Sequence, residues 1–456
     1  MVVTAGQQDR RHLLLDPMLS GDLVALAQSV TKSAVEVARA EDLPLVLRRA
    51  FAEAVRPPAG PVLVSIPMDI LEEDTDVPVP ARSTVFPPAP AGGIDEATRL
   101  LARAQRPAII AGDGVGRERA MAPLVVLAEA LGAAVFHQPM ADGINFPGNH
   151  PLYQGMVLPT QADIRARLEP YDVVLIVGTQ AFMAHHYTPP EPIPVGTTVI
   201  QLDSDAAGVG RNFPVACGLV GGIAPTLAEL ARRLRGRVRG GAQRARGIGA
   251  VVRARRDEVD EAARGRYGAA PLDPLAAVHA IASNLPLDAV VIEEAITAGL
   301  LLRQVLRQDA PGSYVHTVGG ALGWGIGAAI GTRLGHPHRP VVAVLGDGCA
   351  TFGLQGLWSA AHYRTPVAFF VFNNGEYRTL KDTLDRRKSR STERGRYVGL
   401  DLTEPTLDWQ AAGRLFGIPT VRPDNCKELG VLAASAGVLE GPLLIEVPLT
   451  SRSSRS

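Results

Sequence analysis

The sequence predicts an α/β protein built from doubly wound parallel sheets, and two observations support this fold class. Short apolar runs alternate with longer amphipathic segments along most of the chain. Runs that are apolar on both faces and separated by helices are typical of parallel strands covered on both sides. The chain is 456 residues long. Because a single hydrophobic core rarely supports that length, we expect two or three domains.

The first 76 residues supply fewer elements than a whole domain of this type. They contain two strand candidates, MVVTAG at 1–6 and PVLVSIP at 61–67, and one helix candidate, LPLVLRRAFAEAV at 43–55. The proline-rich stretch that follows, VPVPARSTVFPPAPAGG, indicates an extended linker over residues 77–94.

Residues 95–234 are expected to form a central, Rossmann-like domain. Its helices include MAPLVVLAEALG, and its strands are predicted at PAIIAG, AAVFH, VVLIVG and TTVIQLD. Residues 235–270 are rich in arginine and glycine, which indicates a linker, although their second half also fits a solvated helix of alternating charge. No nucleic-acid partner is expected, because the 46 basic and 46 acidic residues of the chain cancel.

Residues 271–450 form the last predicted domain, and 451–456 a tail, with strands at AVVIEE, SYVHT, VVAVLGD, VAFFVFN and PLLIEV. Two of these strands lead into polar residues: VVAVLGD ends in Asp347, and VAFFVFN leads into Asn373-Asn374. One crossover helix, LQGLWSAAHYR, is predicted between them. Ligands of open parallel sheets bind beyond the carboxyl ends of the strands, so we expect these side chains to face one crevice.

The residue types at these strand ends favour a magnesium diphosphate. Gly346 and Gly348 permit a tight turn and close approach of a ligand to the backbone. The turn leads into a helix N-terminus, whose free N–H groups favour phosphate. Carboxylate, amide and carbonyl oxygens are hard donors, and Mg²⁺ takes one or two such groups beside phosphate oxygens and water.

With this GDG-crossover-NN arrangement the sequence resembles the thiamine diphosphate-dependent enzymes over nearly its whole length. The further landmarks stand in the expected order: TAGQQ at 4–8, GPVLVSIPMDI at 60–70, DVVLIVGTQAF at 172–182, LDSDAAGVGRN at 202–212 and GGALGWGIGAAIG at 319–331. TAGQQ, the F-x-x-H-x-Y pattern from Phe182 to Tyr187, and NNGEYRTL most resemble the benzoylformate decarboxylase branch. The resemblance implies three doubly wound domains, the first one truncated here, with thiamine diphosphate and Mg²⁺ as cofactors.

The resemblance also assigns roles to individual residues of the last domain. Asp347, Asn374 and the backbone carbonyl of Glu376 correspond to the magnesium ligands. The residues that correspond to the diphosphate site are Gly346, Gly348, Cys349 and Thr297. Leu322 corresponds to the bulky residue that supports thiamine in its bent form, and Gly320 to a carbonyl that meets the aminopyrimidine.

Two further expectations concern catalysis. His185 corresponds to an active-site histidine that handles protons. In the family, a glutamate that activates the aminopyrimidine comes from a part of the first domain that would precede Met1, and this chain offers no counterpart. Acid–base help of this kind is worth about 10²–10⁴-fold. Without this glutamate the chain as written could be inactive. We expect a start site assigned too late or a fragment, with a pseudoenzyme or regulatory subunit as the alternative.

The branch of the family decides the expected reaction, the non-oxidative decarboxylation of a 2-oxo acid, with carboligation as a further possibility. The alternative is an acetolactate synthase-like carboligase that binds FAD, because GDGVGR at 112–117, Asp203 and Asp205 fit a nucleotide fold. Where those synthases carry an Arg-Phe-Asp run, this chain has FMAHHY, which favours the decarboxylase over FAD binding. The resemblance places Thr379 and Thr383 where the benzoylformate decarboxylase branch has a small residue and a phenylalanine. We therefore expect a more polar pocket mouth and a 2-oxo acid other than benzoylformate.

Assembly and location follow from the same reasoning. In the family the active site forms between subunits, so the resemblance implies a homodimer or homotetramer. No apolar run is long enough to span a membrane, and the N-terminus lacks a signal-peptide pattern. Three widely separated cysteines fit a reducing compartment. We expect a cytoplasmic protein with a small-molecule partner and no membrane partner.

Overall fold

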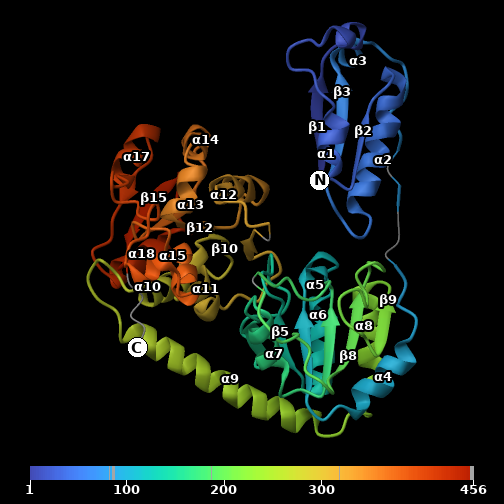
Figure 1. Cartoon of the computed structure of the whole chain (residues 1–456), viewed down its shortest axis with the longest axis vertical. Helices are drawn as coiled ribbons and strands as arrows, with labels where there is room; N and C mark the ends of the chain where they lie inside the picture. Colours follow the sequence, from blue (N-terminus) through green and yellow to red (C-terminus); the bar gives the residue numbers. More distant parts are fainter. Residues whose placement is uncertain (82, 85–87, 186, 318, 452–456) are drawn as a thin grey trace. The chain divides into compact units, whose positions relative to one another are not determined.

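The computed structural model describes residues 1–81, 83–84, 88–185, 187–317 and 319–451, and Figure 1 shows its elements. The chain divides into two compact units, residues 1–88 with 204–206, and residues 89–203 with 207–456. Three sheets form the fold, and the strands of each pair in parallel. The predicted α/β class with parallel sheets is therefore confirmed. Within the described ranges, no helix is both long and apolar enough to cross a lipid bilayer.

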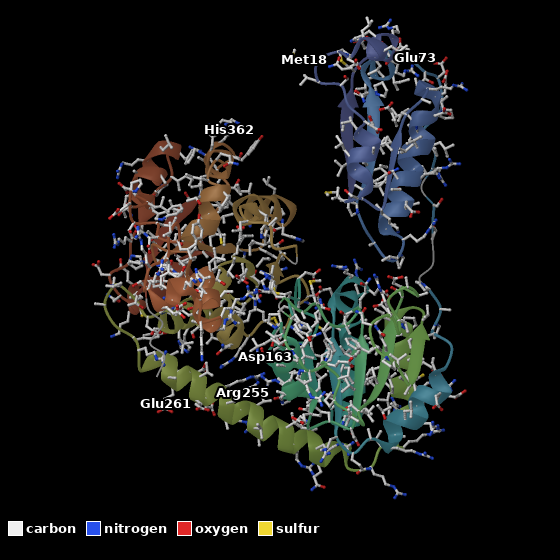
Figure 2. All side chains as sticks on the ribbon, viewed as in Figure 1. Met18, Glu73, Asp163, Arg255, Glu261 and His362 are labelled. Atoms are coloured by element: carbon white, nitrogen blue, oxygen red, sulfur yellow. The ribbon has the colours of Figure 1, made fainter. Side chains whose placement is uncertain are left out.

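The first unit holds a three-stranded sheet in the order β1-β3-β2. Its central strand is buried along its whole length because the neighbouring strands and α2 cover it. The strands and helices are β1 (Val2–Gln7), η1 (Arg10–Leu15), α1 (Leu23–Gln28), β2 (Ser33–Glu36), η2 (Ala40–Asp42), α2 (Leu43–Val55), β3 (Val62–Pro67) and α3 (Met68–Glu72). Several apolar side chains of this unit are exposed: Leu14, Leu15, Leu19, Leu26 and Met18, the last labelled in Figure 2.

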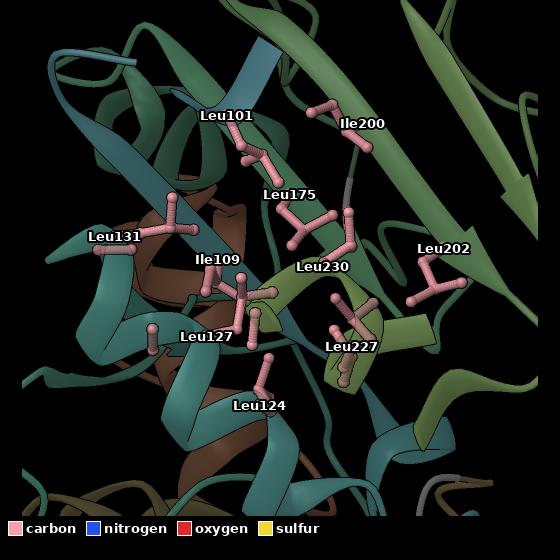
Figure 3. Packing of buried hydrophobic residues seen from close by; sticks show 14 of the residues in the cluster. Leu101, Ile109, Leu124, Leu127, Leu131, Leu175, Ile200, Leu202, Leu227 and Leu230 are labelled. Atoms are coloured by element: carbon pink, nitrogen blue, oxygen red, sulfur yellow. The ribbon is translucent and has the colours of Figure 1, made fainter. Parts of the chain in front are cut away.

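The central sheet has six strands in the order β6-β5-β4-β7-β8-β9. Its strands are β4 (Pro107–Ala111), β5 (Ala134–His137), β6 (Tyr153–Met156), β7 (Val173–Val177), β8 (Thr198–Asp203) and β9 (Cys217–Val220). Its helices are α4 (Ile94–Arg103), α5 (Asp113–Arg117), α6 (Met121–Leu131), α7 (Gln161–Leu168) and α8 (Ile223–Leu234). Figure 3 shows the core on one face, where Ile109, Leu175 and Ile200 of the strands pack against leucines of α4, α6 and α8.

The last sheet has six strands in the order β11-β10-β12-β13-β15-β14. Its strands are β10 (Val290–Glu294), β11 (Tyr314–His316), β12 (Val341–Gly346), β13 (Val367–Asn373), β14 (Thr420–Val421) and β15 (Leu443–Pro448). Its helices are α10 (Pro274–Ala282), α11 (Ile296–Val305), α12 (Trp324–Gly335), α13 (Asp347–Phe352), α14 (Gly356–His362), α15 (Arg378–Arg386), α16 (Arg390–Glu393), α17 (Trp409–Phe416) and α18 (Cys426–Ser435). Val342 and Phe370 join the core beneath α10, α11 and α18, whereas Val341 and Phe369 join the core beneath α12, α14 and α17.

Four strands of the structure, β2, β6, β9 and β14, were not predicted from the sequence, and two of the predicted features differ in the structure. The predicted single crossover helix between β12 and β13 is two short helices, α13 and α14. The second difference is α9 (Gly241–Arg264), a 24-residue helix within the stretch expected to be a linker at 235–270. No helix or strand occupies the described part of residues 77–93, and the predicted tail beyond Ser451 lies outside the described residues.

Helix α9 is held by arginines that donate to backbone carbonyls of the central domain. Arg244 donates to the Leu131 carbonyl at the C-terminal end of α6, at 2.6 Å, where the helix dipole favours a cation. Arg255 donates to the Gln154 carbonyl at 2.9 Å. The opposite side of α9 is solvated, as Glu261 shows in Figure 2. The alanines and arginines of α9 are good helix formers, which offsets its three glycines, and these bonds attach the helix to the central domain.

Candidate functional site

A cavity of about 360 Å³ lies at the carboxyl ends of β10, β12 and β13. Three segments supply most of its wall: 295–298 at the start of α11, 346–349 at the start of α13, and 374–380 after β13. Eight of the residues singled out in the sequence line it together: Thr297, Leu322, Gly346, Asp347, Gly348, Cys349, Asn374 and Glu376. The parallel topology brings them together because all three strands end on the same edge of the sheet.

Asp347 is the first residue of α13 and its side chain is buried at the cavity wall. Its carboxylate accepts hydrogen bonds from the N–H groups of Gly348, at 2.7 Å, and Gly375, at 2.8 Å. Burial raises the pKa of Asp347 to about 6, because the charged form is poorly solvated there. A cation bound at this carboxylate would offset that cost, so the position suits a metal ligand.

The paired amides after β13 point to different partners. Asn374 lines the cavity, and its side-chain oxygen accepts a hydrogen bond from the Glu376 N–H at 3.0 Å. Asn373 instead donates to the buried Glu446 of β15 at 2.9 Å and is not a wall residue. One amide therefore faces the cavity while the other ties β13 to its neighbouring strand.

The turn at Gly348 requires glycine because of Tyr377. A Cβ atom added at Gly348 would lie 2.5 Å from Cε1 of the tyrosine ring. The neighbouring Cys349 is buried, and burial raises the pKa of its thiol to about 12. Cys349 is thus a neutral thiol that can contribute its backbone N–H group to a ligand but not a thiolate nucleophile.

A buried glutamate that the sequence reasoning missed supports the wall at Leu322. The carboxylate of Glu294, at the end of β10, accepts hydrogen bonds from the N–H groups of Gly323 and Gly325, the latter at 2.9 Å. Burial raises its pKa. Glu294 therefore caps α12 and fixes the loop that carries Leu322 into the cavity. The signal available in the sequence was an acidic pair that ends an otherwise apolar strand, AVVIEE.

The donor set fits a magnesium diphosphate. The Asp347 carboxylate, the Asn374 amide and the Glu376 carbonyl are hard oxygen groups on one cavity wall. Thr297 adds a hydroxyl from the first turn of α11. Across the described positions, no group of three or more His, Cys, Asp or Glu side chains is placed to bind a metal by itself. A cation here would therefore share its coordination with ligand oxygens, as magnesium does with phosphates.

Comparison with known proteins decides the family. Residues 94–230 match the family model for the thiamine pyrophosphate enzyme central domain, and residues 297–447 match that for the C-terminal TPP binding domain. The chain belongs to the thiamine pyrophosphate enzymes. Thiamine pyrophosphate and thiamine diphosphate are the same compound, so the family expected from the sequence is confirmed.

Within the thiamine pyrophosphate enzymes the chain is similar to decarboxylases and synthases. Benzoylformate decarboxylase of Pseudomonas aeruginosa is 32% identical over 98% of this chain and 82% of its own length. Acetolactate synthase of Mycobacterium bovis is 28% identical over 82% of this chain and 61% of its own length. Among solved structures, 4-hydroxybenzoylformate decarboxylase of Rhodococcus jostii is 28% identical, with a TM-score of 0.84 over 99% of this chain and 83% of that one. Benzoylformate decarboxylase of Polynucleobacter necessarius is 27% identical, with a TM-score of 0.85 over 99% and 82%.

Gly320 and His185, both expected at the site of a thiamine pyrophosphate enzyme, do not line the cavity, and neither does Thr383, which was expected at its mouth. Gly320 has a positive φ of 69° in an exposed loop two residues before Leu322. His185 is exposed in the loop after β7, where its backbone N–H donates to the Pro159 carbonyl at 2.8 Å. Both are loop residues, whose path cannot be deduced from strand periodicity.

The glycine-rich turn of the central domain packs against protein. A Cβ atom at Gly112 would lie 2.4 Å from Cβ of Thr179, and one at Gly116 would lie 2.7 Å from the Asn145 side-chain oxygen. The Asp113 carboxylate between them accepts hydrogen bonds from the side chains of Gln138, at 2.6 Å, and Asn145, at 2.9 Å. These contacts account for the GDGVGR sequence by packing within the central domain.

Proposed function

We propose that this thiamine pyrophosphate enzyme decarboxylates a 2-oxo acid without oxidation and requires Mg²⁺. The observation that supports this most directly is the shared cavity wall formed by Asp347, Asn374 and Glu376. When bound, thiamine diphosphate would supply an electron sink for the carbon–carbon bond that breaks as CO₂ leaves. The similarity to benzoylformate decarboxylase favours this reaction over other chemistries of the cofactor.

We assign the following roles at the cofactor site to residues of this chain. Asp347, Asn374 and the Glu376 carbonyl would hold Mg²⁺, and the metal would in turn hold the diphosphate oxygens. Gly346 would leave room for the diphosphate, which the N–H groups of Gly348 and Cys349 and the Thr297 hydroxyl would bind. Leu322 would support the bent cofactor, and the Gly320 carbonyl would meet the aminopyrimidine. His185 would move a proton at the substrate carbon, with the loop after β7 bringing it to the site.

The cavity favours a 2-oxo acid with a polar substituent. Thr379 and Leu380 line the cavity one turn before Thr383. Thr383 itself does not line the cavity, and its hydroxyl donates to the Thr379 carbonyl at 2.9 Å and accepts from the Arg386 guanidinium at 3.3 Å. Of these two threonines, it is Thr379 that brings a polar side chain to the cavity wall. We therefore propose a substrate with a hydroxyl or other polar group beyond the oxo acid. The similarity to a 4-hydroxybenzoylformate decarboxylase supports the same class.

The family resemblance further supports a cytoplasmic homodimer or homotetramer. Two alternatives remain as outcomes of the test: acetolactate-forming carboligation, supported by the similarity to an acetolactate synthase, and a non-catalytic chain that binds the cofactor. The packing of the glycine turn at 112–116 gives less support to an acetolactate synthase-like carboligase that binds FAD.

The test is a turnover assay with thiamine diphosphate and Mg²⁺. Pyruvate, benzoylformate and 4-hydroxybenzoylformate would be supplied separately, with CO₂ release and aldehyde formation measured. We expect aldehyde from an aromatic 2-oxo acid, with the hydroxylated acid preferred. The His185→Ala variant should then lose about 10²-fold in turnover, the usual size of a general acid–base contribution, without losing cofactor affinity. Acetolactate from pyruvate would contradict the decarboxylase proposal, and cofactor binding without any turnover would support the non-catalytic alternative.

A further inference from the structure

The segment 375–402 forms a closed loop whose two ends pair with each other. The Leu402 N–H donates to the Gly375 carbonyl at 2.7 Å, and the Tyr377 N–H donates to the Leu400 carbonyl at 2.9 Å. Between these bonds, Glu376 and Asp401 are paired in an antiparallel bridge. The loop, which contains α15 (Figure 1), therefore begins and ends at the same place beside the cavity.

This closed loop supplies a large share of the cavity wall. Its wall residues come from both ends: Glu376, Tyr377, Arg378, Thr379, Leu380, Gly399 and Leu400. Any separation of the two ends would move the Glu376 carbonyl and the residues beside it. The shape of the cavity therefore depends on what holds the ends together.

Lys381 joins the two ends through their side chains. Its ammonium group bonds the Glu376 carboxylate at the first end and the Asp401 carboxylate at the last end. Lys381 is 8% exposed and lies with its ammonium 5.6 Å from the centre of the Tyr397 ring, a further residue of the loop. Lys381 is not itself a wall residue. A buried cation that bridges two carboxylates is costly to remove, because the Glu376 carboxylate is then left with the longer contact to Arg378, at 3.5 Å.

We propose that Lys381 is a positioning residue for the cofactor site: it holds segment 375–402 closed and so keeps the Glu376 carbonyl and the wall from Tyr377 to Leu380 in place. The proposal rests on the proposed function only for the identity of the ligand. The closure itself is a property of the chain without ligand. Arg378 assists within α15, since it donates to the Asp382 carboxylate at 2.6 Å and lies 3.5 Å from that of Glu376.

The test compares Lys381→Met with Lys388→Met, a matched change at an exposed lysine of the same segment. Hydrogen–deuterium exchange of peptides that cover 375–402 is measured without cofactor, and thiamine diphosphate affinity is measured by calorimetry with Mg²⁺. Because removing one partner of a buried ion pair leaves the other uncompensated, Lys381→Met should raise exchange at both loop ends and weaken cofactor binding, each about tenfold. Lys388→Met should match the wild type in both.

A second variant covers the case in which Lys381→Met does not fold. Asp401→Asn, at a carboxylate whose side chain is 60% exposed, should change exchange and affinity in the same direction by a smaller factor. The double variant Lys381→Met, Asp401→Asn should show no more exchange and no weaker cofactor binding than Lys381→Met alone. Both changes remove the same interaction between Lys381 and Asp401. Wild-type-like exchange in Lys381→Met, or equal effects in Lys388→Met, would overturn the proposal. If the wild type does not bind thiamine diphosphate, the proposed function fails, while the exchange measurement still decides the role of Lys381.

Discussion

The carboxylate of Asp347 accepts a hydrogen bond from the backbone N–H of Gly375 at 2.8 Å. The bond joins the residue that follows β12 to the loop that follows β13, so the two strand ends that carry GDG and NN are tied together without a ligand. A site that is already formed loses less conformational freedom when a cofactor binds.

Gly348→Ala should weaken cofactor binding by displacing a wall residue. The added Cβ would lie 2.5 Å from the Tyr377 ring, so the ring or the turn must move. We expect the thiamine diphosphate dissociation constant, measured by calorimetry with Mg²⁺, to rise at least about tenfold, a loss of about 1.4 kcal/mol. Gly327→Ala is the control, because a Cβ at this exposed position of α12 would meet nothing within 4 Å. Equal affinity in both variants would show that Tyr377 and the turn adapt freely.

Asp113→Asn should stabilise the protein at alkaline pH. Burial, together with the nearby Asp142 carboxylate, raises the pKa of Asp113 to about 7. Since this folded-state pKa exceeds the unfolded value of about 3.9, the stabilising contribution of the protonated carboxyl is lost as pH rises toward 7. Asparagine cannot ionise. At pH 8 the Asp113→Asn variant should therefore be more stable than the wild type by about 2 kcal/mol, measured as a higher melting temperature. At pH 5 the two proteins should differ little.

The control for this pH dependence is Asp288→Asn at an exposed aspartate. The melting temperature of Asp288→Asn should equal that of the wild type at both pH 5 and pH 8. The stability that Asp113→Asn gains over the wild type should be larger at pH 8 than at pH 5. If this gain were as large at pH 5, or larger, the assignment of a raised pKa to Asp113 would be wrong.

Arg303→Met should destabilise the last domain. Glu293 is fully buried, and its carboxylate pairs with Arg303 and accepts a hydrogen bond from the Tyr314 hydroxyl at 2.8 Å. Burial opposes its charge, but the Arg303 guanidinium holds the pKa of Glu293 at about 2. Removing the arginine leaves the buried charge with His316, 3.2 Å away, and with neutral donors. Loss of one partner of a buried ion pair typically costs about 3–5 kcal/mol. Thermal unfolding should show this loss.

Two companion variants separate charge from packing at Arg303. Arg364→Met, at an exposed arginine, should unfold like the wild type. The double variant Glu293→Gln, Arg303→Met should recover part of the lost stability, because it removes the unpaired charge. No recovery would mean that the cost arises from lost packing around the guanidinium.

The strands of this fold were predictable where burial on both faces makes the sequence continuously apolar. VVAVL and VAFFVF are such runs, and they form β12 and β13. The strands that escaped prediction lack this property: β2 is Ser-Ala-Val-Glu, β6 is Tyr-Gln-Gly-Met, β9 is Cys-Gly-Leu-Val, and β14 has two residues. Such short or polar strands form because a neighbouring strand pairs with them, and pairing is a tertiary effect that no local pattern reveals.

The candidate site was predictable to the same extent. Asp347 and Asn374 could be placed together because both follow strands of one parallel sheet. Leu400 and Leu449 also line the cavity, yet neither belongs to a motif, because loop closure and the end of β15 bring them there. The contacts of Lys381 and Glu294 likewise depend on how loops fold back, which only the three-dimensional arrangement shows.

The most direct test of the central claim is calorimetric titration of thiamine diphosphate into the full chain with and without Mg²⁺, for the wild type and for Asp347→Asn. The wild type should bind the cofactor in an Mg²⁺-dependent manner. The asparagine variant should lose at least about 100-fold in affinity, because the site has few protein ligands and loses its charged one. Asp424→Asn, at an exposed aspartate of the same domain, should bind like the wild type. Equal, Mg²⁺-dependent affinity in Asp347→Asn and the wild type would contradict the account.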